Sequence, residues 1–89
     1  MPQALEKFLG YLIYFLPETN EPIHVHVCKG KPHEGATKIW ITENGAELAH
    51  NGSKIPAHEL KQILRYISAN KDRIVADWVF RYKIGEVKR

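Results

Sequence analysis

The sequence has little of what marks a secreted or membrane protein. Its 89 residues include a single cysteine, so no internal disulfide can form and an oxidising compartment is not favoured. The longest apolar run, residues 8–16, contains a glycine and two tyrosines and is far shorter than the roughly 20 residues needed to cross a bilayer. The start lacks the basic region and long apolar segment of a signal peptide. We therefore expect a cytoplasmic protein that does not contact a membrane.

Positive charge is in slight excess and is unevenly spread. The net charge is +3, but residues 54–89 carry nine Lys and Arg against four Asp and Glu, whereas residues 1–53 carry four against six. The basic C-terminal half is compatible with an anionic partner, either nucleic acid or an acidic protein. The length and a hydrophobic content of 44% predict one small domain over residues 1–89, with its core between residues 8 and 82.

Hydrophobic patterns in the first half predict mainly strands. Residues 2–8 are compatible with one or two helical turns. β-Branched and aromatic residues predict a strand at residues 11–16 and another from residue 23, and the polar turn of residues 17–22 joins them as a hairpin. A third strand is predicted at residues 36–43.

The strongest turn signal is Asn44-Gly45, because both residues tolerate the positive φ of a type I′ hairpin. A two-residue loop there sets Ile41 opposite Leu48 and Ile39 opposite His50. This register assigns Ile39, Ile41 and Leu48 to the core. It turns three other side chains outward as a candidate partner surface: Trp40, Thr42 and Glu47.

The pattern becomes helical after Pro56, which suits a first helical position. The apolar stripe consists of Leu60, Ile63, Leu64 and Ile67. We predict a break near Asn70, because Lys71 would otherwise enter the stripe, and a second segment that ends near Tyr82. Trp78 is expected to be the largest buried side chain of the C-terminal half. The result is an α+β fold, in which a small antiparallel sheet of three to four strands packs on one or two C-terminal helices.

The stretch "IHVHVCKG" at residues 23–30 carries the most chemistry. Alternation along a strand places His24, His26 and Cys28 on one face, opposite the apolar Ile23, Val25 and Val27. The apolar side suits the core, so we expect the histidine row, defined here as His24, His26 and Cys28, to be exposed rather than buried.

Three interpretations of the row remain open. It is most simply a set of exposed or locally hydrogen-bonded side chains. A metal site is the first alternative, because zinc accepts imidazole nitrogen and thiolate sulfur, and the candidate ligands are His24, His26, Cys28 and His33. The second alternative is a small ribonuclease of the mRNA-cleaving toxin type, in which His24 or His26 acts as general acid or base. We expect no cofactor, with zinc as the alternative.

A basic stripe on the predicted helix forms a further candidate site. His58, Lys61 and Arg65 share one helical face and could contact phosphates, although such a stripe is more often only the solvated side of an amphipathic helix.

The order of these features resembles a family of short bacterial proteins, domain-of-unknown-function family 4160. The resemblance rests on Pro22-Ile-His-Val-His-Val27, the Ile55-Pro56 step before the helix and Trp78 near the end. The family signature reads Pro-Pro-His-Phe-His-Val, so Ile23 and Val25 depart from it. The similarity covers roughly residues 8–82. The resemblance implies no established activity. It does imply a neighbouring short protein, as in toxin–antitoxin-like pairs.

These observations lead to one expectation about function. No complete catalytic set is present, so we expect a non-enzymatic binding module that recognises a small cognate protein and, through its basic half, nucleic acid. The oligomeric state is left open.

Overall fold

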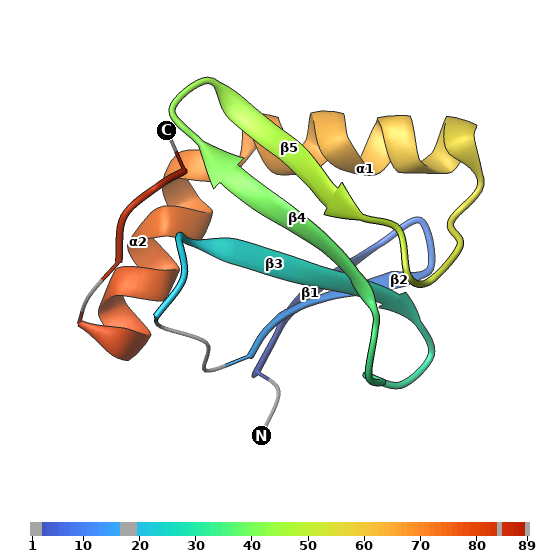
Figure 1. The fold of residues 1–89 in the computed structure, drawn as a ribbon, viewed down its shortest axis with the longest axis horizontal. Coiled ribbons are helices and arrows are strands. Elements are labelled where there is room, and N and C mark those ends of the chain that lie inside the picture. Colours follow the sequence, from blue (N-terminus) through green and yellow to red (C-terminus); the bar gives the residue numbers. More distant parts are fainter. Residues whose placement is uncertain (1–2, 17–19, 84, 89) are drawn as a thin grey trace.

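A computed structural model describes residues 3–16, 20–83 and 85–88. Five strands come first and two helices follow, as Figure 1 shows. The strands form one antiparallel sheet in the order β1-β2-β3-β4-β5, so each strand pairs with its neighbours in the chain. The elements are β1 (Gln3–Phe8), β2 (Tyr11–Phe15), β3 (His24–Lys29), β4 (Thr37–Thr42), β5 (Gly45–His50), α1 (Ala57–Ala69) and α2 (Lys71–Tyr82). The predicted α+β class is confirmed, with one strand more than expected.

The extra strand corrects the prediction of a helix at residues 2–8. Residues 3–8 form the edge strand β1 instead, while Pro2 and residues 17–19 of the predicted turn lie outside the described residues. Long-range contacts hold β1 extended. Phe8 stacks on Tyr66 of α1 with ring centroids 4.1 Å apart, and Glu6 accepts hydrogen bonds from Tyr66 Oη and Arg73. A helix of two turns has no such partners and is marginal by itself.

The β4–β5 hairpin is present, but its register differs from the prediction. The loop residues are Glu43 and Asn44, and Gly45 already pairs with Thr42 as the first residue of β5. Leu48 is therefore opposite Ile39 rather than Ile41, and it is 37% exposed instead of buried. Gly45 has φ +146°, a conformation that L residues rarely adopt, and a Cβ there would also collide with the Ser68 hydroxyl of α1, so both the backbone of the turn and the packing of the helix require glycine.

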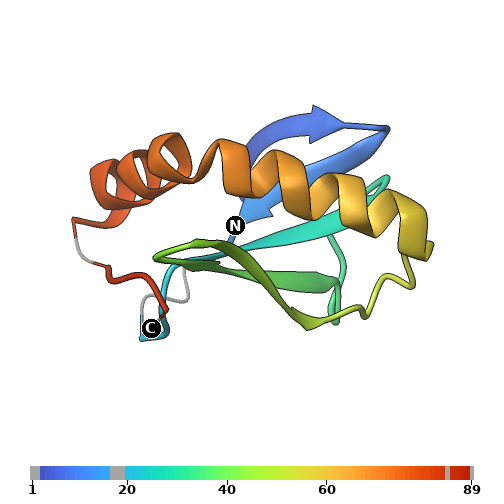
Figure 2. The ribbon, with the colours of Figure 1, turned by 90° about the horizontal axis from the view of Figure 1, so that it is seen from above.

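The main core lies between one face of the sheet and both helices, which Figure 2 shows on the same side of the sheet. Ile63 and Ile67 of α1 and Ile74 and Trp78 of α2 are its buried helical members. The sheet contributes Ile13, Phe15, Val25, Val27, Ile39 and Ile41, all 0–1% exposed. Burying one such side chain stabilises the fold by about 1.5–3 kcal/mol. The predicted core face of β3 is thus confirmed.

The helices break where the sequence predicted. α1 ends at Ala69 and α2 begins at Lys71, with Asn70 between them at φ −109° and ψ 14°. The Asn70 side chain donates a hydrogen bond to the Tyr66 carbonyl at 2.8 Å. No helix in the described part of the chain is long and apolar enough to span a bilayer.

The C-terminal segment returns to the sheet and closes the end where β3 begins. The Ile23 N–H donates to the Glu86 carbonyl, and the Lys88 N–H donates to the Ile41 carbonyl, each at 2.8 Å. Lys88 also forms a parallel bridge with Thr42. β3 pairs with β4 only as far as Trp40, and the C-terminal segment pairs with the end of β4 beyond that point.

Candidate functional site

The histidine row is buried, which corrects the expectation that it is exposed. His24 and Cys28 have no exposed surface and His26 is 7% exposed. The three side chains do share one face, opposite Val25 and Val27, as alternation along the strand requires. What the sequence pattern could not indicate is that other segments cover the row: the rings of Trp40 and Trp78 lie beside His24, and a separate apolar cluster surrounds Cys28.

The cluster around Cys28 is a second, smaller apolar cluster on the outer face of the sheet. Its buried members are Tyr14, Cys28 and Ala36, and Leu12 and Leu16 pack against them. The Cys28 thiol donates a hydrogen bond to the Lys31 carbonyl at 3.3 Å, which ties the loop after β3 over the sheet. Burial raises the pKa of the Cys28 thiol, and a hydrogen bond with Tyr14 partly offsets this rise. Cys28 is therefore a poor nucleophile in the folded protein.

His24 is enclosed by aromatic rings. Its ring centroid lies 5.5 Å from Trp40, 5.4 Å from Trp78 and 5.1 Å from His26. Its Nδ1 is 2.9 Å from the Pro22 carbonyl oxygen, which can only accept, so Nδ1 carries a proton. His26 stacks on Tyr14 at 5.5 Å. A general acid or base must reach the proton that it transfers, and the described conformation gives RNA no access to the His24 ring.

The four candidate zinc ligands do not converge. His33 lies exposed in the loop between β3 and β4, where its Nε2 is 3.3 Å from Ser53 Oγ and its Nδ1 is 3.0 Å from the Glu34 carbonyl oxygen. Within residues 3–16, 20–83 and 85–88, no three His, Cys, Asp or Glu side chains are grouped closely enough to hold a metal ion. The His50 side chain is also exposed, and the residue lies at the end of β5, opposite Lys38.

An open pocket of about 340 Å³ lies beside the smaller cluster. Tyr14, Leu16, Pro32, His33 and Glu34 line it. The pocket lies between the smaller apolar cluster and the loop that carries His33. Apart from Tyr14, which is buried, its polar side chains are exposed and none is held by an ion pair with another lining residue.

The predicted partner surface, Trp40, Thr42 and Glu47, occupies the same face nearer the β4–β5 turn. Trp40 and Glu47 are directly paired across the two strands. Trp40 and Thr42 are half-buried and Glu47 is exposed. The Lys38 ammonium lies over the Trp40 ring, 4.5 Å from its centroid, while it pairs with Glu21 at 2.7 Å. Trp40 thus anchors a surface of mixed charge.

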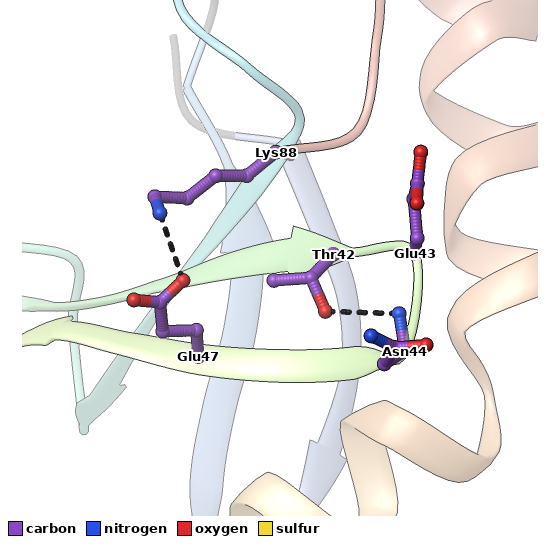
Figure 3. A pocket seen from close by; sticks show the side chains of 5 residues that line it. All are labelled: Thr42, Glu43, Asn44, Glu47 and Lys88. Carbon is purple, nitrogen blue, oxygen red and sulfur yellow. Dashed lines mark hydrogen bonds and ion pairs between the residues drawn. The ribbon is translucent and has the colours of Figure 1, made fainter.

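Two members of this surface also line a second pocket of about 270 Å³, which Figure 3 shows. Its walls are Thr42, Glu43, Asn44, Glu47 and Lys88. Lys88 reaches across from the C-terminal segment and pairs with Glu47 at 3.0 Å. The Asn44 N–H donates to Thr42 Oγ1 at 3.2 Å and fixes the turn. Glu43 and Glu47 contribute two carboxylates to the walls of this pocket, and Lys88 contributes one ammonium.

Sequence reasoning missed some residues of these surfaces. Lys88 is remote in sequence from the hairpin, so only the folded C-terminal segment reveals it. Phe80, on the solvent side of α2, is 75% exposed, with the Lys83 ammonium 5.1 Å from its ring centroid. Its place outside the stripe of Ile74 and Trp78 is the signal that could have identified it.

The candidate phosphate contacts lie together on one side of α1. His58, Lys61 and Arg65 are all exposed, in agreement with their predicted place on the polar face of the helix. They lie on α1 itself, so they are separate from the outer face of the sheet.

Comparison with known proteins gives one match. Searches of curated proteins and of solved structures found none. A family model described as "Domain of unknown function (DUF4160)" matches residues 10–79, which include the histidine row, the β4–β5 hairpin and Trp78. The match covers well over half of the chain, and the protein belongs to this family.

Proposed function

We propose that the protein is a non-enzymatic, cytoplasmic binding module that recognises a small cognate protein, as one member of a bacterial toxin–antitoxin-like pair. One contrast on the outer face of the sheet carries the proposal. The side chains that could perform chemistry are buried, since His24 and Cys28 have no exposed surface and His26 is 7% exposed, whereas the partner surface beside them is open around a pocket.

The chemistry of this surface suits recognition of a protein. Aromatic residues are enriched in interfaces, and the half-buried Trp40 presents a rigid aromatic ring with the Lys38 ammonium over it. The pocket beside Trp40 offers the exposed carboxylate of Glu47, together with Glu43 and Lys88. A basic or hydrogen-bonding side chain of the partner would fit there.

The test begins in the native cell, where the tagged protein is cross-linked and its captured protein is identified, expressed and purified. Isothermal titration calorimetry then compares the wild type with Glu47→Lys. We expect a loss of affinity of about tenfold or more, since a like charge would face the basic group of the partner. Glu34→Lys makes the same charge change on an exposed loop away from this pocket and should change affinity less than threefold.

Two results would reject the proposal. One is the absence of any reproducible captured protein. The other is equal affinity of the wild type and Glu47→Lys for the captured protein. Cleavage of RNA by the purified protein, lost in His26→Ala, would instead establish the ribonuclease hypothesis.

A further inference from the structure

The solvent-facing side of α1 has an unusual composition. The exposed residues of the helix are Ala57, His58, Lys61, Gln62, Arg65 and Ala69. None is acidic and none is a large apolar side chain. The only carboxylate of α1, Glu59, is half-buried and accepts a hydrogen bond from Tyr11 Oη at 3.3 Å, so it is engaged with the sheet.

The cations of this face are not neutralised, whereas five of the other ten described Lys and Arg residues are. Five basic side chains have a carboxylate partner within 3.2 Å: Lys38, Lys71, Arg73, Arg81 and Lys88. In the part of the chain that the structure describes, neither Lys61 nor Arg65 forms an ion pair or a hydrogen bond through its side chain. Their charge is therefore available to a ligand.

The spacing of these residues suits a polymer of phosphates. From His58 to Arg65 the helix rises about 10 Å at 1.5 Å per residue. Each strand of a duplex advances roughly 3.4 Å per phosphate along its axis, so the row can meet about three phosphates. Lys54 is exposed in the loop just before α1 and adds a further cation at the positive end of the helix dipole.

The same composition argues against other anionic partners. Protein interfaces favour aromatic and large apolar anchors at their centre, and helices that lie on membranes insert such residues between lipids. This face offers only alanines, an amide, an imidazole and two cations, and the two alanines let a backbone approach closely. We propose that the exposed face of α1, through Lys61 and Arg65 with His58 and Lys54, binds the phosphate backbone of nucleic acid without reading its sequence. This site is separate from the proposed protein-binding surface.

The experiment measures fluorescence anisotropy of a labelled 20-base-pair duplex with the full-length protein at 50, 100 and 200 mM salt. We expect weak binding, on the order of 10⁻⁴ to 10⁻⁵ M at the lowest salt, which weakens steeply as salt rises. The double variant Lys61→Gln/Arg65→Gln should bind at least tenfold more weakly and should reduce the slope of log K against log salt by about two.

The matched control is Lys31→Gln/Lys83→Gln, which removes two exposed cations from other parts of the surface. It should change affinity less than threefold, and circular dichroism should show both double variants folded. The proposal is overturned if the wild type does not bind at 50 mM salt, or if both double variants weaken binding equally. Binding to vesicles of anionic lipid with no binding to the duplex would also overturn it. None of these results depends on a protein partner, so the two proposals fail separately.

Discussion

Gly85 lies directly against the indole of Trp78. A Cβ built on Gly85 would be 2.5 Å from Trp78 Nε1 and 3.1 Å from a side-chain carbon of Ile23, and the glycine has φ +153°. This contact joins the C-terminal segment to the largest fully buried side chain. Trp78 in turn touches Phe15, with centroids 5.1 Å apart, and His24. Any residue larger than glycine at position 85 would therefore force the surrounding atoms to move.

Gly85→Ala should destabilise the protein by about 1–3 kcal/mol, the usual cost of overpacking. For a domain of this size each kcal/mol lowers the midpoint of thermal unfolding by roughly 4–8 °C. Gly30→Ala is the control, because Gly30 also has a positive φ, +83°, but nothing lies within 4 Å of its added Cβ. The midpoints of thermal unfolding of the two variants are measured by circular dichroism. A larger loss in Gly85→Ala than in Gly30→Ala would be due to the collision with Trp78 and Ile23. Equal losses in both variants would contradict the packing argument.

His24→Ala should cost about 2–4 kcal/mol in the free energy of unfolding, because it leaves a cavity among buried rings and removes the hydrogen bond to the Pro22 carbonyl. Urea titration is the measurement. His58→Ala on the exposed side of α1 should change this free energy by less than about 0.5 kcal/mol. Equal stability of His24→Ala and the wild type would contradict the burial of the His24 ring.

Stability should fall as the solution becomes alkaline. Burial raises the pKa of Cys28 and of Tyr11 and Tyr82, and for Tyr11 the nearby Glu59 adds to the rise. A group with a higher pKa in the folded state keeps its proton there, so its contribution is complete below the unfolded pKa and is lost as pH rises through the folded pKa.

The fall should begin near pH 8.5 to 9 for the thiol and steepen above about pH 10 for the phenols. Midpoints of thermal unfolding between pH 7 and pH 11 test this, and Tyr11→Phe should make the decline shallower. A midpoint that stays constant or rises over this range would show that these three groups are not buried in their protonated forms.

Glu6→Ala should loosen the first strand. The Glu6 carboxylate accepts hydrogen bonds from Tyr66 Oη and from Arg73 Nη2, and so links β1 to both helices. Loss of a charge-assisted hydrogen bond of this kind costs about 1–3 kcal/mol. Amide hydrogen exchange should accelerate in β1 and β2, whereas exchange in the β4–β5 hairpin should change little. The exposed Glu34 gives the control, since Glu34→Ala should leave exchange in both regions unchanged.

Features that depend on local periodicity were predictable from the sequence. The stripe that contains Ile63 and Ile67 predicts α1, and the polar Asn70-Lys71 step predicts its end. Asp77 and Arg81, which are four residues apart in α2, form an ion pair at 2.9 Å, as helical spacing allows. Alternation correctly put Val25 and Val27 in the core, because the geometry of a strand sets its two faces whatever lies beyond them.

Features that depend on partners far along the chain were not predictable. Residues 3–8 form a strand because β2, Tyr66 and Arg73 hold them, and a segment so short has no strong preference of its own. At the β4–β5 hairpin, the sequence could not indicate that Gly45 packs against Ser68 of α1, where a Cβ would collide with the hydroxyl.

The candidate site shows the same division. Sequence alone determined that His24, His26 and Cys28 share a face, that Trp40, Thr42 and Glu47 share one, and that His58, Lys61 and Arg65 line a helix. Only the tertiary structure decided that the first set is buried, that Thr42 and Glu47 of the second set line an open pocket with Lys88, and that the third set lacks neutralising carboxylates. The physical reason is that backbone geometry fixes the direction of a side chain, whereas its exposure depends on which distant segments pack over it.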